Sequence, residues 1–192
     1  MFPWIPFLSY IIIVAYTPGP NNIMSMNVAK NVGFKKSIKF NLGIFIGIFI
    51  VMILCLIFSN ILYNIIPKIQ LPMKILGAAY MIFLIIKIII PQKEHTTKNN
   101  SGTFIIGALL QLINPKLIIY GITAMSSFIM PHYNETPVFI LFALLLAFVG
   151  VTGTLCWALF GSLFTVLLKK HGTLLNIIMA VLLLYCAVSL FI

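Results

Sequence analysis

The chain is a succession of long apolar runs separated by short segments rich in Lys, Pro and Gly. Each run is long enough to cross the hydrocarbon core of a bilayer as a helix, which requires about 20 residues. The predicted spans are residues 4–28, 39–62, 72–90, 104–130, 137–162 and 173–192. The pattern therefore predicts an all-α integral membrane protein with six transmembrane helices in a single domain, 1–192.

Two of the predicted spans are interrupted by helix-breaking residues. Residues 17–20, Thr-Pro-Gly-Pro, interrupt the first span, and residues 114–116, Asn-Pro-Lys, interrupt the fourth. Proline removes a backbone donor and clashes with the preceding turn. Because lipid offers no donor to the freed carbonyls, such breaks persist only inside the protein or beside a cavity. Interrupted helices at corresponding places in two halves of a chain are typical of a transporter's substrate site.

The distribution of Lys predicts an orientation and an internal symmetry. Lys residues concentrate in the segments after the first, third and fifth spans, which the positive-inside rule places in the cytoplasm with both termini outside. Residues 1–90 and 104–192 then hold three spans each, on either side of a polar cytoplasmic loop, 91–103. An odd number of spans in each half predicts two inverted three-helix repeats, with helices one and four broken.

Composition agrees with this class and narrows the partners. The chain is 62% hydrophobic and 7% charged, too apolar for a water-soluble domain of 192 residues. Its net charge of +10 comes from Lys residues that we expect to contact anionic lipid headgroups rather than nucleic acid. No basic segment precedes the first span, so we expect that span to be retained. The three Cys residues lack the spacing of metal ligands or of a redox motif.

No set of residues typical of an enzyme lies in the predicted spans. The three His residues and the two Glu residues all fall in predicted loops, and Asp and Arg are absent from the sequence. Catalysis requires acids, bases or nucleophiles that are held together, so the sequence predicts no enzyme, no catalytic residue, no metal site and no cofactor. Because no Asp or Glu lies in a predicted span, the sequence also excludes a proton relay through carboxylates within the membrane.

Lys116 lies well inside the fourth predicted span, where an ammonium group costs about 2.5–3.5 kcal/mol on insertion scales. We interpret it as a residue that meets the carboxylate of a zwitterionic substrate or titrates during transport; the alternative is an ammonium that reaches the interface. Asn21, Asn22 and Asn114 adjoin the breaks. They could bind a substrate or satisfy freed backbone groups, and both interpretations stay open.

Further candidates lie in the same layer of the membrane. The half-helix that follows Pro20 presents backbone N–H groups and a positive dipole end, which suit an anion. Tyr80 and Tyr120 place aromatic rings with polar tips near this layer, although a packing role is more frequent for such residues. Gly43 and Gly47 form a small-xxx-small pair that we interpret as a helix-packing surface.

These motifs together resemble the LysE/RhtB family of bacterial amino-acid exporters. The similar segments are TPGPNN at 17–22, LGIFIG at 42–47, LGAAY at 76–80 and INPK at 113–116. The resemblance spans nearly the whole chain. Segments such as 77–88 and 110–131 are most similar to family members that export cysteine and O-acetylserine. Many family members carry an acidic residue directly after the second Gly of the 42–47 motif, whereas this chain has Ile48.

The resemblance implies efflux of small neutral amino acids from the cytoplasm, across the bacterial cytoplasmic membrane, through a six-span bundle. It also implies a substrate site at the residues of the two breaks. These are Pro18, Gly19, Pro20, Asn21, Asn22, Asn114 and Lys116. The expected partners are the amino-acid substrate and the lipid bilayer, and a homo-oligomer stays open. The alternatives are export of another amino acid, of the homoserine, threonine or lysine type, or a small membrane-embedded acyltransferase.

The predicted orientation can be tested by chemical labelling. A single Cys at position 134, in a variant without the three native Cys residues, should react with a membrane-impermeant thiol reagent in intact cells. The reason is that the segment around Asn134 contains no Lys and is expected to lie outside. Labelling at position 98 instead of position 134 would reverse the orientation.

Overall fold

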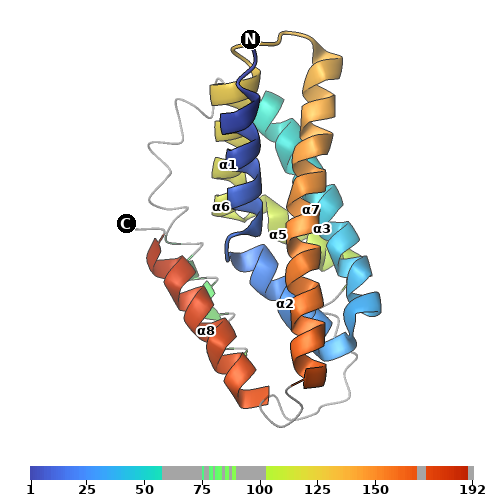
Figure 1. The fold of residues 1–192 in the computed structure, drawn as a ribbon, viewed down its shortest axis with the longest axis vertical. Helices are drawn as coiled ribbons and strands as arrows, with labels where there is room; N and C mark the ends of the chain where they lie inside the picture. The colour runs from blue at the N-terminus through green and yellow to red at the C-terminus, as the bar shows by residue number, and fades with distance from the viewer. Residues whose placement is uncertain are drawn as a thin grey trace.

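The structure, a computed structural model, describes residues 1–57, 75, 78–79, 81–83, 85–86, 88–89, 103–167 and 172–189. Every regular element among these residues is a helix, as predicted (Figure 1). The elements are α1 (Trp4–Tyr16), α2 (Pro20–Val32), α3 (Phe34–Ile57), α5 (Phe104–Leu112), α6 (Pro115–Thr123), the π-helical segment η2 (Ala124–Ile129), α7 (Thr136–Leu167) and α8 (Gly172–Ser189).

Among the described residues, two unbroken helices are long and apolar enough to cross a membrane, Phe34–Ile57 and Thr136–Leu163. A third candidate is the pair Phe104–Leu112 and Pro115–Ile129, whose axes differ by 64° at the break. The first predicted span consists of two shorter helices, α1 and α2. About half of the residues of the third predicted span, 72–90, lie outside the described residues, so the count of six spans stays a prediction.

The basic segment between the first two spans is helical, which corrects the loop expected there. Helix α2 continues to Val32, and α3 starts at Phe34 rather than at Lys39. Lysine is a good helix former, so a helix can extend beyond the apolar part of its sequence. Only Gly33 interrupts the helix: its φ of 84° gives the left-handed backbone that favours glycine at a helix C-terminus.

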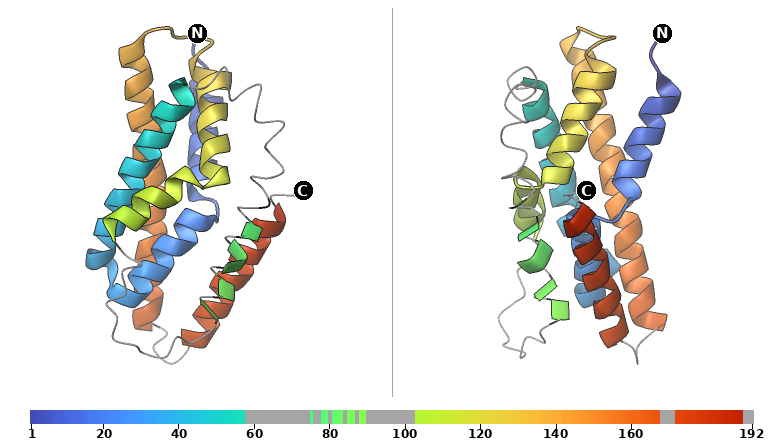
Figure 2. Two further views of the ribbon diagram at one scale, coloured as in Figure 1. Left: turned by 180° about the vertical axis from the view of Figure 1, so that it is seen from behind. Right: turned by 90° about the vertical axis from the view of Figure 1, so that its left-hand side faces the viewer.

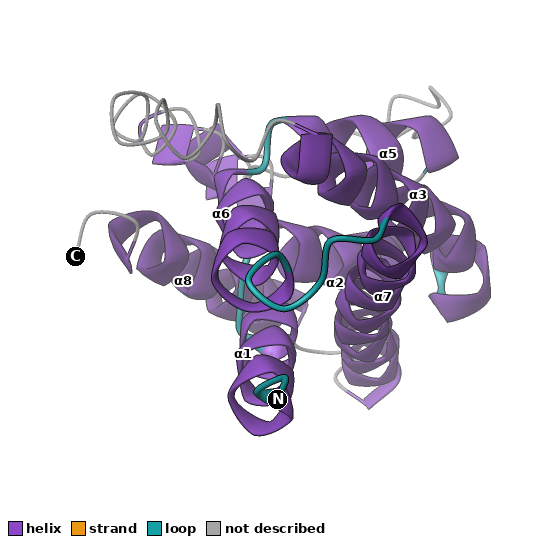
Figure 3. Ribbon diagram, turned by 90° about the horizontal axis from the view of Figure 1, so that it is seen from above, coloured by secondary structure: helices purple, strands orange, loops and turns teal. Residues whose placement is uncertain are grey.

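The broken helices lie against the two long ones. Helix α1 runs from the N-terminal end to the middle of the bundle, where α2 continues toward the opposite end (Figure 1). From behind, α5 crosses the bundle at mid-height and α6 turns away from it along the long axis (Figure 2). Seen from above, α3 lies between α5 and α7 (Figure 3). The most extensive contacts are α3 with α5 and α2 with α7.

Glycines make these contacts close enough for backbones to touch. A Cβ atom on Gly43 would lie 2.0 Å from the carbonyl oxygen of Phe104, and one on Gly107 would lie 2.3 Å from that of Phe40. A Cβ on Gly47 would come within 2.5 Å of another α5 carbonyl. Small residues allow close helix approach in lipid. The interpretation of Gly43 and Gly47 as packing residues is therefore confirmed.

Glycines also allow close contact between α7 and the first broken span. A Cβ on Gly153 would lie 2.5 Å from the carbonyl oxygen of Ala15 in α1, and one on Gly161 would lie 2.3 Å from that of Met26 in α2. Both halves of the first broken span are therefore in backbone contact with one continuous helix.

The outer faces of the helices are apolar. Large side chains such as Ile13, Leu42 and Leu141 are exposed, whereas Phe7, Ile44 and Leu146 are fully buried. Soluble proteins rarely expose such a continuous apolar surface. Such a surface is expected for a protein that is surrounded by lipid.

Adding a methyl group at the α3–α5 contact should destabilise the bundle. Gly43→Ala places a Cβ against backbone atoms that cannot rotate away, and overpacking of this kind costs about 1–3 kcal/mol. The expected result is a lower unfolding temperature in detergent than for wild type. Leu42→Ala, at an exposed neighbouring position, is the control and should be near neutral. Equal unfolding temperatures for Gly43→Ala and wild type would contradict the close contact.

Candidate functional site

The first helix break contains a run of backbone carbonyls that no helix satisfies. Helix α1 ends at Tyr16 and α2 begins at Pro20, with Thr17 as the C-cap of the first helix and Gly19 as the N-cap of the second. The last carbonyls of a helix have no intrahelical donor. In this segment Pro20 also removes a donor, because proline has no N–H. Other groups must therefore supply the hydrogen bonds.

The last helical bond of α1 runs from the Thr17 N–H to the Ile13 carbonyl at 3.0 Å, so the unsatisfied carbonyls begin at Val14. Local side chains satisfy some of them: the Thr17 hydroxyl donates to the Val14 carbonyl at 3.0 Å. The side-chain amide of Asn22 donates to the carbonyls of Ala15 at 2.9 Å and Thr17 at 2.7 Å. Of the two interpretations of Asn22, the structure shows the backbone-satisfying one.

Distant helices supply the remaining donors. The indole N–H of Trp157 in α7 donates to the Tyr16 carbonyl at 3.0 Å. The ammonium of Lys116 in α6 donates to the Thr17 carbonyl at 3.0 Å, the Thr17 hydroxyl at 3.1 Å and the Pro18 carbonyl at 3.2 Å. Each carbonyl from Ile13 to Pro18 thus accepts a hydrogen bond. Lys116 therefore connects the second break to the first.

The second break is capped in the ordinary way of a helix start. Asn114 is the N-cap of α6, and its side-chain oxygen accepts a hydrogen bond from the Leu117 N–H at 3.4 Å. Pro115 follows at the first helical position, where its missing N–H has no intrahelical partner to lose. Asn114 therefore also serves the backbone, and its cap directs Lys116 toward α1.

A pair of side-chain amides, one half-buried and one buried, joins the two breaks at a second point. The side chains of Asn21 and Gln111 donate to each other, with 3.1 Å from Gln111 Nε2 to Asn21 Oδ1. Gln111 also donates to the Gly107 carbonyl at 2.9 Å, and it is fully buried. Gln111 was not predicted as a site residue, because it lies inside an apolar run and before the break itself. The available signal was an amide inside an apolar run, one helical turn before Asn114.

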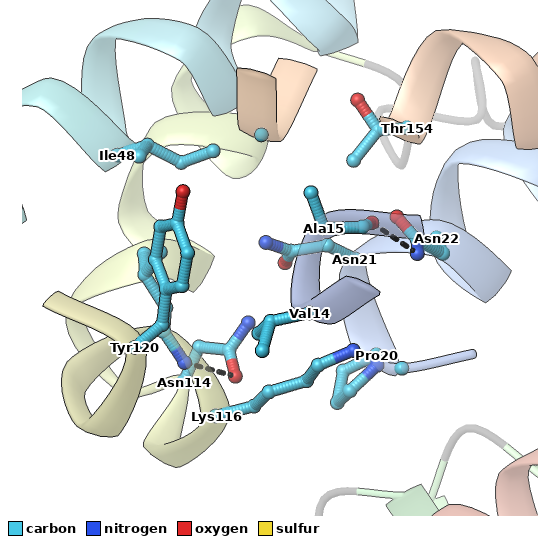
Figure 4. A pocket seen from close by; sticks show the side chains of 13 residues that line it. Val14, Ala15, Pro20, Asn21, Asn22, Ile48, Asn114, Lys116, Tyr120 and Thr154 are labelled. Atoms are coloured by element: carbon cyan, nitrogen blue, oxygen red, sulfur yellow. Dashed lines mark hydrogen bonds between the residues drawn. The ribbon is translucent and has the colours of Figure 1, made fainter. Parts of the chain in front are cut away.

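A narrow cavity of about 40 Å³ lies between the two breaks (Figure 4). Space of this size holds water-sized groups, so a larger ligand requires the surrounding helices to move apart. Most of the predicted site residues line it: Gly19, Pro20, Asn21, Asn22, Asn114, Lys116 and Tyr120. Pro18 does not line the cavity, but its carbonyl accepts a hydrogen bond from Lys116, which does. Tyr80 lies outside the described residues.

Six further lining residues were not predicted. Val14 and Ala15 come from α1 and Leu117 from α6, whereas Ile48 comes from α3, and Gly150 and Thr154 come from α7. Their sequence signal is weak, because each is an ordinary residue inside an apolar span. Tyr120 combines two roles: it lines the cavity, and its ring stacks on Tyr10 with centroids 5.9 Å apart.

The charge in the cavity comes from one side chain. Among the described lining residues, Lys116 alone carries a formal charge. Its ammonium lies at the C-terminal end of α1, where the helix dipole favours a cation, and close to the N-terminal end of α2, which favours an anion. A Cβ on Gly19 would lie 3.0 Å from Lys116 Nζ, so glycine leaves the space that the Lys side chain occupies. The described residues contain no cluster of potential metal ligands.

Comparison with known proteins identifies the family. The model of the LysE type translocator family matches residues 12–192. The chain belongs to this family. It is therefore a translocator rather than an enzyme, as predicted.

Curated relatives cover almost the same length. The chain is 40% identical over 186 residues to cysteine/O-acetylserine efflux proteins of Escherichia coli K12 and Shigella flexneri serotype 5b, covering 96% of this chain and 95% of each relative. The efflux protein of Escherichia coli O6:H1 strain CFT073 gives the same identity and coverage. No solved structure matches the chain significantly.

Restoring backbone continuity at the first break should abolish transport. In the double variant Pro18→Ala, Pro20→Ala, new N–H donors let α1 and α2 join, and the carbonyls that hold Lys116 return to intrahelical bonds. We expect normal membrane insertion and loss of substrate efflux from cells. Full efflux by this variant would show that the break is not needed.

Proposed function

We propose that this chain exports small neutral amino acids, cysteine or O-acetylserine, from the cytoplasm, and that the substrate binds in the cavity between the two helix breaks. Support comes from the curated relatives, which are named cysteine/O-acetylserine efflux proteins and match nearly the whole chain. The single structural observation that carries the site is Lys116, whose ammonium lies in the cavity against the carbonyls of Thr17 and Pro18.

The cavity offers complementary groups for a zwitterion. The carboxylate of the substrate would bind at Lys116 and the N-terminus of α2, where a cation and backbone N–H groups come together. The side-chain oxygens of Asn21 and Asn114 line the same cavity and could accept hydrogen bonds from the substrate ammonium. A cationic substrate such as lysine would bring a second positive charge close to Lys116 without a described carboxylate to offset it.

Binding at Lys116 would change the first break. In this proposal, hydrogen bonds from the ammonium to a substrate carboxylate replace bonds that it now gives to Thr17 and Pro18. Hydrogen bonds to charged groups contribute about 1.5–3 kcal/mol each, so the exchange is large enough to affect helix geometry. Substrate binding and the conformation of the α1–α2 break are therefore coupled in this proposal.

The proposed architecture is two inverted repeats, residues 1–90 and 104–192. In this alignment α1 and α2 correspond to α5 and α6, and α3 corresponds to α7. The contacts fit that relation: the broken segments of each half pack mainly on the continuous helix of the other half. The Lys-rich α2–α3 corner lies at the opposite end of the bundle from the N-terminus, which supports an outside N-terminus (Figure 1).

Transport measurements on purified protein test this function. Liposomes containing the protein should exchange labelled cysteine for unlabelled cysteine or O-acetylserine, and lysine should compete poorly because of its second cation. Running the assay with and without an imposed pH gradient separates exchange from proton coupling. Preferential exchange of lysine would refute the proposed site.

Removing the Lys116 charge should separate binding from folding. Lys116→Met should insert normally, since it removes a membrane charge, but transport should fall at least about tenfold, which corresponds to about 1.4 kcal/mol. Lys116→Arg should also be impaired, because a planar guanidinium does not match the compact geometry of an ammonium. Lys35→Met, which removes an exposed charge at the start of α3, is the matched control.

A second measurement distinguishes ligand binding from a purely structural role of Lys116. Cysteine should raise the unfolding temperature of wild type in detergent, because a ligand stabilises the state it binds, but not that of Lys116→Met. If the Met variant is stabilised by cysteine to the same extent, the ammonium only ties the helices together.

A further inference from the structure

The cavity has a second end, away from Lys116, whose composition bears on substrate choice. Ile48, Thr154 and the hydroxyl of Tyr120 lie there, across the cavity from Lys116 and Pro20 (Figure 4). Under the proposed function, a substrate anchored by its carboxylate at Lys116 directs its side chain toward this end. The inference below rests on that function and concerns which side chains fit.

Ile48 limits the depth of this end. Its side chain is buried and extends over Gly150, where a Cβ atom would lie only 2.8 Å from Ile48 Cδ1. Ile48 therefore fills the space that Gly150 leaves open. A substrate side chain meets a branched apolar group that packs directly on α7, so a long side chain has no room to extend.

The two hydroxyls beside Ile48 offer acceptors. Thr154, which is 1% exposed, donates its hydroxyl proton to the Val151 carbonyl at 2.9 Å. Tyr120 donates to the Leu146 carbonyl at 3.5 Å. A hydroxyl has one proton and two lone pairs, so both oxygens keep lone pairs for a ligand but no further proton. Such a wall suits a ligand group that donates a hydrogen bond.

We infer that this end of the cavity selects a short side chain ending in a hydrogen-bond donor, a thiol or a hydroxyl, over the longer O-acetyl ester. An ester has acceptors and no donor, so it would face two acceptor oxygens without a hydrogen bond. It would also collide with Ile48. Of the two substrates named for the relatives, cysteine is thus the preferred one for this chain.

Competition in proteoliposomes tests the length limit. For wild type, the inhibition constants of cysteine and serine against exchange of labelled cysteine should be at least about tenfold lower than that of O-acetylserine. The reason is that one misfitting group in a pocket changes specificity by about 10-fold to 200-fold. Ile48→Ala should bring the two inhibition constants together by enlarging this end. Ile44→Ala removes the same atoms one turn earlier on α3, is equally buried and does not line the cavity. It should keep the wild-type ratio.

A second comparison tests the hydrogen-bond acceptors that Thr154 and Tyr120 offer at this end of the cavity. Serine and alanine differ only in a hydroxyl, so wild type should prefer serine. Thr154→Val keeps the shape and removes one acceptor, which should reduce this preference severalfold. Thr152→Val is the control, because Thr152 bonds the Val149 carbonyl in the same manner but does not line the cavity.

The outcomes separate this inference from the proposed function. Wild type that exchanges no amino acid refutes both. Wild type that exchanges amino acids but accepts O-acetylserine as well as cysteine refutes the inference alone, as does an unchanged ratio in Ile48→Ala. If Ile48→Ala does not fold, Ile48→Val, which removes only the Cδ1 methyl, replaces it and should shift the ratio in the same direction.

Discussion

Unsatisfied backbone carbonyls in lipid are the constraint on which this structure depends. The break between α1 and α2 leaves a run of carbonyls, Val14 to Pro18, without intrahelical partners, and the hydrocarbon core of a bilayer supplies no water to replace them. Their donors come from Thr17 itself, from α2, from α6 and from α7. The break is therefore stable only inside the assembled bundle. Folding of the two halves of the chain is linked through it.

This requirement explains why the packing is so close. Asn22 reaches its carbonyls because they lie only five and seven residues earlier in the chain, whereas Trp157 reaches the Tyr16 carbonyl across the close contact of α7 with α1 at Gly153. Glycines at the contacts of α7 with α1 and of α3 with α5 allow that approach. In lipid the apolar faces gain little from leaving their surroundings, so backbone satisfaction and close packing provide most of the specificity.

The sequence predicted the features that follow from local chemistry. The apolar runs predicted the helical class, and the prolines within two of them predicted both breaks and most of the residues around the cavity. These signals could be recognised because each is contained in a few neighbouring positions. Gln111, Ile48 and Thr154 were missed because their importance comes from what other helices place opposite them. The helical α2–α3 corner was also missed, since the edge of an apolar run marks the membrane boundary and not the end of a helix.

The way Lys116 is compensated bears on how such a site can release its substrate. Glu135 lies exposed in a loop, and among the described residues no carboxylate lines the cavity, so the ammonium is held by neutral dipoles at the end of α1. A carboxylate partner in a low dielectric would form a much stronger pair than carbonyls do, and a substrate could displace it only at large cost. Carbonyls satisfy the ammonium when the site is empty yet yield to an incoming anion. They also recover it afterwards, because the Pro18 carbonyl has no other donor among the described residues and the Thr17 carbonyl keeps only that of Asn22. An exporter must bind its substrate weakly enough to release it. Lys116, which can bond either a substrate carboxylate or the carbonyls of the broken helix, meets that requirement.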